Sequence, residues 1–115
     1  MKLLTDAQRE QLLKNGKLSH YCDGGIDHFP VVKLFTPDGA CTWLLSEIDP
    51  NDPDLAFGLC DLGMGCPELG YVSLAELAGV RGRLGLPIER DLYFKPTKRL
   101  TAYASEASAA GCIVT

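Results

Sequence analysis

Two short apolar runs separated by a cluster of glycine, cysteine and proline constrain the fold more than any other feature of this chain. They occupy residues 55–62 and 68–74, and Gly63, Gly65 and Pro67 lie between them. Runs of this length bounded by turn residues are typical of β-strands, because helices in proteins usually need ten or more residues. We therefore predict a β-hairpin over residues 55–74 and expect it to lie at the centre of a small sheet.

A second hairpin is predicted just before the first. Residues 30–35 are rich in β-branched side chains, and Pro37-Asp38-Gly39 is a turn sequence that leads into a partner strand at 41–48. Neither face of that partner strand is cleanly polar, so we expect both faces to be partly covered. Strict alternation places Thr42, Leu44 and Ser46 on one face and Trp43, Leu45 and Glu47 on the other.

Capping patterns predict three helices. Thr5 followed by Gln8 begins the first, which we expect to end at Asn15-Gly16. Ser73 begins a short second helix. Thr101 is expected to cap an alanine-rich third helix that Gly111 closes.

The order of these elements predicts an α+β fold. A fifth, edge strand is expected at 89–94, which gives an antiparallel meander of four to five strands with an N-terminal helix, a short middle helix and a C-terminal helix. We expect the helices at both ends of the chain to pack on one face of this sheet. The length of 115 residues suits a single domain, 1–115.

The composition favours the cytoplasm over other locations. The chain has no apolar run of membrane-spanning length, and its amino terminus turns polar within a few residues, so we expect neither a membrane association nor a secretory signal. Five cysteines form no framework spacing and are expected to be free thiols, mostly buried. Neither a phosphate-binding loop nor a nucleophile elbow is present, so we expect no catalytic residue, no cofactor and no small-molecule ligand.

The distribution of charge is more informative than the net charge of −4. Residues 34–80 contain eight acidic residues and no lysine or arginine. Such a block produces a negative field that attracts basic partners. We therefore expect a non-enzymatic protein that binds a basic or nucleic-acid-binding protein partner through an acidic surface, with nucleic-acid mimicry as one form of this role. The expected binding residues are Asp49, Asp52, Asp54, Asp61, Glu68 and, as an aromatic anchor, Tyr71.

Two alternatives remain open. One is a small metal-dependent enzyme or nucleic-acid processor, because imidazole and thiolate are ligands that zinc prefers; its ligands would be His20, Cys22, His28 and Cys66. The other is weak binding of single-stranded nucleic acid by a basic segment that also carries Tyr93 and Phe94. The cations of that segment are Arg81, Arg83, Arg90, Lys95, Lys98 and Arg99.

Several phrases of the sequence resemble a known family. PVVKLFTPDG at 30–39, FGLCDLGMGCPELGYVSLAEL at 57–77 and GLPIERDLYFKP at 85–96 are similar to a bacterial family called domain of unknown function 2958. The resemblance covers nearly the whole chain. It implies a small protein encoded on plasmids and integrative mobile elements, which favours an accessory or anti-defence role, and it implies no activity and no catalytic residues.

Overall fold

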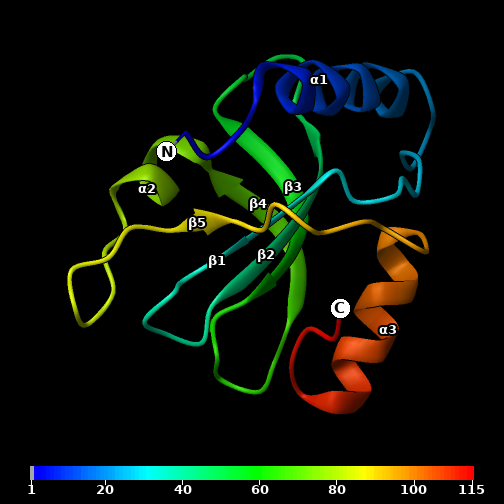
Figure 1. Ribbon diagram of the computed structural model, residues 1–115. Coiled ribbons are helices and arrows are strands. Elements are labelled where there is room, and N and C mark those ends of the chain that lie inside the picture. Colours follow the sequence, from blue (N-terminus) through cyan, green and yellow to red (C-terminus); the bar gives the residue numbers. More distant parts are fainter. Residues whose placement is uncertain (1) are drawn as a thin grey trace.

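The computed structural model describes residues 2–115 and has the predicted α+β architecture (Figure 1). Three helices and five strands follow the predicted order. Their bounds are α1 Asp6–His20, β1 Val32–Phe35, β2 Thr42–Ile48, β3 Leu55–Asp61, β4 Glu68–Ser73, α2 Leu74–Gly79, β5 Glu89–Arg90 and α3 Leu100–Ala110.

The five strands form one antiparallel sheet in the order β4-β3-β2-β1-β5. The predicted hairpin over residues 55–74 is present as β3–β4, but the expectation that it lies at the centre is wrong. β2 is central, because it pairs with β1 on one side and with β3 on the other. β4 is therefore an edge strand.

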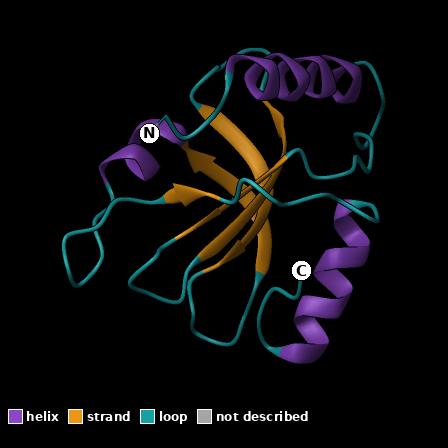
Figure 2. Ribbon diagram, viewed as in Figure 1, coloured by secondary structure: helices purple, strands orange, loops and turns teal. Residues whose placement is uncertain are grey.

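Helices cover both faces of the sheet, which corrects the expectation that they share one face (Figure 2). Leu12 of α1 and Leu77 of α2 pack with Trp43 and Leu45 on one face, which we call the α1 face. Side chains of α3 pack on the opposite, α3 face. Alternation explains the arrangement, because β2 is apolar at consecutive positions and needs a cover on each side. The α3-face cluster contains Leu44, Leu59, Leu100, Tyr103 and Ala107.

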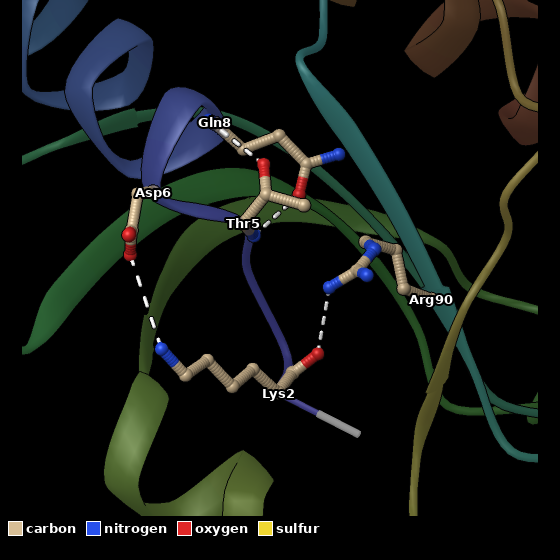
Figure 3. A network of polar contacts seen from close by, with 5 residues as sticks. All are labelled: Lys2, Thr5, Asp6, Gln8 and Arg90. Carbon is tan, nitrogen blue, oxygen red and sulfur yellow. Dashed lines mark hydrogen bonds and ion pairs between the residues drawn. The ribbon is translucent and has the colours of Figure 1, made fainter.

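The start of α1 confirms the predicted capping box (Figure 3). The Thr5 hydroxyl accepts a hydrogen bond from the Gln8 amide at 3.1 Å, and the Thr5 amide donates to the Gln8 side chain at 2.9 Å. Arg90 of β5 donates to the Lys2 carbonyl at 2.7 Å. The amino-terminal segment is thereby tied to the far edge of the sheet.

The predicted end of this helix at Asn15-Gly16 is wrong, because α1 continues to His20. Both residues are buried against β2. The Asn15 amide donates to the Ser46 carbonyl at 2.9 Å, and a β-carbon at Gly16 would lie 1.7 Å from the Ile48 carbonyl oxygen. The pair that usually ends a helix instead allows α1 to approach the sheet closely.

At the same place β2 contains a β-bulge, which changes the face on which Glu47 lies. The register passes from Leu45 opposite Gly58 to Glu47 opposite Phe57, so Ser46 is the extra residue. One extra residue reverses the facing of every residue after it. Glu47 therefore lies on the α3 face with Phe57, whereas strict alternation placed it with Trp43 and Leu45.

The carboxyl-terminal part differs from the prediction in two places. The expected strand at 89–94 is reduced to the two residues of β5, at the edge as predicted. The helix α3 begins at Leu100 rather than after a Thr101 cap, and the carboxylate of Asp27 accepts hydrogen bonds from the amide and hydroxyl of Thr101. Gly111 ends this helix with a φ of 76°, as predicted. Within residues 2–115, no helix is both long and apolar enough to cross a bilayer.

Candidate functional site

A pocket of about 460 Å³ lies on the α3 face, next to the first turn of α3. Its walls come from the last turn of α1, the loop at 24–28, the first residues of α3 and the end of β2, and its floor comes from β3 and β4. The residues that line it and carry the argument below are Ser19, His28, Glu47, Phe57, Leu69 and Tyr71.

Aromatic and aliphatic side chains form the floor of this pocket. Phe57 of β3 and Tyr71 of β4 are paired across the ladder, and their rings meet edge to face with centroids 5.1 Å apart. Tyr71 is 60% exposed and Leu69 is 42% exposed, although both lie on a sheet face that α3 partly covers. The floor is therefore apolar surface that a ligand could still cover.

Glu47 supplies a partly buried carboxyl at the inner wall. Burial raises the pKa of Glu47 above 4.5, and the nearby Asp49 acts in the same direction. The Ser19 hydroxyl and the His28 ring act in the opposite direction, and more weakly than burial. Within residues 2–115, no lysine or arginine forms an ion pair with Glu47 or lines the pocket. The site thus holds a partly buried carboxyl that no lysine or arginine of the described residues neutralises.

His28 joins the segments that surround the pocket. Its Nε2 lies 3.0 Å from the Ser19 hydroxyl and 3.0 Å from the Asn15 carbonyl oxygen, and its own carbonyl accepts from the Leu100 amide at 2.9 Å. One residue therefore connects the last turn of α1 to the first turn of α3. The chain can reach this position from α1 because Gly24 and Gly25 adopt left-handed φ values of 80° and 77°.

The predicted partner-binding residues fall into separate places. Asp49 and Tyr71 line the pocket. Asp52 and Asp54 lie with Asp49 in the β2–β3 connection, where Asp52 accepts from the Asp54 amide at 3.1 Å. Asp54 accepts from the Ser73 hydroxyl at 2.6 Å and the Ala75 amide at 2.8 Å, and these bonds lower the pKa of its carboxyl. Asp54 thus caps α2.

The other two acids lie at the opposite end of the sheet. Asp61 ends β3 and Glu68 begins β4, so a seven-residue strand of about 20 Å separates them from the β2–β3 connection. Asp61 is 3% exposed and accepts from the amides of Gly63 and Ile113 at 2.9 and 3.0 Å. It anchors the carboxyl-terminal tail and presents no carboxylate to solvent.

The predicted metal ligands are not brought together. His28 is engaged with α1, His20 is the exposed last residue of α1, and Cys22 is exposed in the following loop. The expectation that the cysteines are mostly buried is wrong, because Cys22, Cys66 and Cys112 are exposed and the other two are half-buried. Cys66 lies in the β3–β4 turn, close to the end of α3 at Gly111. No group of three or more histidine, cysteine or acidic side chains in residues 2–115 is arranged to hold a metal ion.

Most of the predicted nucleic-acid-binding cations make internal contacts. Arg81 donates to the carbonyls of Ala78 and Val80, and Arg99 donates to the Asp27 carbonyl at 2.9 Å. Lys98 forms an ion pair with Glu106, and Arg90 holds the Lys2 carbonyl. Arg83 and Lys95 are exposed, as is Tyr93 at 89%. Lys95 and Lys98 line a pocket of about 380 Å³ together with Tyr93, Asp91 and Glu106, whereas the four arginines of the segment lie outside it.

Sequence reasoning missed Glu47, Phe57 and Ser19 as site residues. The one available signal was Glu47, a charged residue inside a strand that has no other charge. A strand of this composition usually has a reason to retain a charge. The bulge at Ser46 and the extension of α1 to Ser19 had no such signal, since both depend on the contact between α1 and β2.

A family model described as "Protein of unknown function (DUF2958)" matches residues 3–114 of the chain. No significant match was found among curated proteins or among solved structures.

Proposed function

The chain belongs to this family of proteins of unknown function, and we propose that it is a non-enzymatic binding module. The pocket on the α3 face takes up a basic side chain, arginine or lysine, of a protein partner. The observation that carries the proposal is Glu47, a partly buried carboxyl above an apolar floor with no internal lysine or arginine partner.

The electrostatics of the pocket favour a cation. Desolvation makes the Glu47 carboxylate unfavourable in the free protein, and an entering guanidinium or ammonium group would offset that cost. Asp27 and Asp49 add two further carboxyl groups to the lining. The remaining acids of residues 34–80 contribute without touching the partner. Their negative field acts over a distance and, at low salt, accelerates the approach of a basic protein.

The floor favours an arginine or lysine over a metal cation. The Phe57 and Tyr71 rings offer apolar surface to the methylene stem and π-electron density to the charged group. A hard metal ion would need several converging oxygen ligands, and the three carboxyl groups of the lining do not form such a group within residues 2–115.

The test uses a fluorescent peptide in which arginine alternates with valine, and a matched peptide in which neutral citrulline replaces arginine. Anisotropy titrations are made with the wild type, with Glu47→Gln and with Glu76→Gln. Glu76 belongs to the same acidic block but lies on α2, away from the pocket. Glu76→Gln thus removes one charge without touching the site.

The arginine peptide should bind the wild type at least about tenfold more tightly than the citrulline peptide, since a charge-assisted hydrogen bond is worth about 1.5–3 kcal/mol. Glu47→Gln should weaken the arginine peptide by about the same factor, and Glu76→Gln by no more than about twofold. Equal effects of the two substitutions would show that the peptide is attracted by the overall negative charge and does not bind at Glu47. Failure of the arginine peptide to bind the wild type would contradict the proposal itself.

We also propose that the protein acts in the cytoplasm as an accessory protein of plasmids or related mobile elements. The five cysteines are all free, which suits a reducing compartment. The mobile-element role rests on the family resemblance alone. An anti-defence activity would follow if the partner proved to be a basic, nucleic-acid-binding host protein.

A further inference from the structure

The outer edge of β4 offers main-chain groups that no other strand of residues 2–115 uses. β4 pairs with β3 on one side and ends the sheet on the other. The Leu74 amide donates to the Asp54 carbonyl at 2.8 Å, and bonding pairs alternate along an antiparallel ladder. Bonded residues therefore recur at every second position before Leu74, so the amides and carbonyls of Val72 and Gly70 face β3. The amides and carbonyls of Tyr71 and Leu69 face outward.

This edge lacks the usual protection against pairing. Natural edge strands are commonly short, bulged, or interrupted by lysine or proline. The opposite edge follows that rule, because β5 has only two residues. β4 has six residues, ELGYVS, with a single charge at its first position and regular pairing along its whole length. Leu69 and Tyr71 are substantially exposed beside it.

The same two residues connect the open edge to the pocket. Their main-chain groups face outward, and their side chains line the pocket floor. A strand added to β4 would place every second side chain on the α3 face, next to Leu69 and Tyr71. Glu47 lies on β2, three strand spacings or about 14 Å from an added strand, so the cationic end of an arginine or lysine would lie over the Tyr71 and Phe57 rings and face the Glu47 carboxyl across the pocket.

We infer that a basic, extended segment of the partner protein adds to β4 as a sixth strand and directs an arginine or lysine side chain across Tyr71 into the pocket. This inference rests on the proposed function and specifies how the partner is held. Charge complementarity identifies the occupant, since residues 34–80 carry eight acids and no lysine or arginine. A second copy of the chain would bring the same acidic block to the same edge.

The first test keeps the wild-type protein and changes the backbone of the arginine–valine peptide. One peptide is N-methylated at its arginines and the other at its valines, so each loses alternate amide donors and keeps its charge. Strand pairing uses only alternate residues of the added segment. One of the two peptides should therefore lose at least about tenfold in affinity, whereas the other should change by no more than about twofold.

The second test changes the protein. Leu69→Pro removes an outward amide while leaving the ladder with β3, and Leu69→Ala removes the side chain while keeping the amide. The proline variant should bind the arginine peptide more weakly than the alanine variant. If the proline variant does not fold, hydrogen exchange of the wild type gives the same information, because the amides of Leu69 and Tyr71 should exchange at least about tenfold more slowly in the complex.

The outcomes separate this inference from the proposed function. Suppose that the arginine peptide binds and that its binding depends on Glu47. If the two N-methylated peptides then bind equally well and the Leu69 and Tyr71 amides gain no protection, strand addition is wrong and the cation pocket remains supported. If no arginine peptide binds, both are wrong. A concentration-dependent dimer that protects the same amides without peptide would replace the partner segment with a second copy.

Discussion

The two faces of the sheet are built from the same strands but are covered to different extents. On the α1 face, Leu45 and Ile48 of β2 are completely buried beneath α1 and α2, and so is Leu12, which α1 itself contributes to this cluster. On the α3 face, one helix covers Leu44 and Leu59, and the strands continue past it to an open floor at Phe57 and Tyr71. The difference indicates that one face provides stability, and that the candidate site lies where the cover of the other face stops.

The largest expected effect comes from removing a leucine on the closed face. Leu45→Ala should lower the free energy of unfolding by about 2–5 kcal/mol, because it leaves a cavity in a fully packed cluster. Leu69→Ala on the open face should cost less than about 1 kcal/mol. Urea unfolding of the two variants measures both values. Equal losses would mean that the α3 face is closed in solution.

The second prediction concerns the close approach of α1. Gly16→Ala should destabilise the protein by about 1–3 kcal/mol, because the added methyl group would collide with the Ile48 carbonyl. Helix propensity alone predicts the opposite, a gain of about 1 kcal/mol. Gly79→Ala in α2 is the matched control, since nothing lies within 4 Å of its added β-carbon. A stabilising effect of Gly16→Ala would contradict the close contact between α1 and β2 at the bulge.

Removing the His28 side chain should destabilise the protein less than removing a core leucine and more than changing an exposed residue. His28→Ala removes the bonds to Ser19 and Asn15 and should cost about 1 kcal/mol of stability. It should also weaken binding of the arginine peptide, since the loop that forms one wall loses its attachment to α1. His20→Ala, in the exposed last turn of α1, serves as the control in thermal unfolding. Similar losses of thermal stability for the two variants would show that the hydrogen bonds of His28 do not stabilise the protein.

The smallest effect is a dependence on pH that distinguishes the two kinds of acid. The pKa of Glu47 is raised in the folded protein, so its protonated form stabilises the fold, and this contribution is lost as the pH rises through that pKa. Asp54 has a lowered pKa, so its contribution is present at higher pH and is lost as the pH falls through its folded-state pKa, below 3.8.

Urea midpoints measured across the acidic range test this contrast. The wild type should lose stability relative to Glu47→Gln as the pH rises above 4.5, and should lose stability relative to Asp54→Asn as the pH falls below 3.8. Parallel curves for the wild type and Glu47→Gln would show that Glu47 is not desolvated.

Local sequence signals predicted the elements well where short-range chemistry decides the structure. The capping box at Thr5 and Gln8, the turn before β2 and the left-handed Gly111 depend on neighbouring residues only, and each is confirmed. The two-sided burial of β2 was also readable, because its apolar residues are consecutive.

The candidate site depended on contacts between distant segments, and the sequence therefore did not reveal it. The local sequence Asn15-Gly16 predicts a helix end, but in the folded protein these two residues contact β2 and allow α1 to pack closely against it. The bulge at Ser46 then turns Glu47 to the face opposite the one that alternation predicts. The acids selected by charge alone include Asp61, which is buried, and Asp54, which caps a helix.

The central claim is that the open half of the α3 face holds a basic segment. The most direct measurement is an amide chemical-shift titration of the isotopically labelled protein with the arginine–valine peptide. The largest shifts should cluster on Ser19, Glu47, Phe57, Leu69 and Tyr71, and the Glu47→Gln variant should lose them. Shifts that instead follow Asp52, Asp54 and α2, or that spread evenly over residues 34–80, would contradict it.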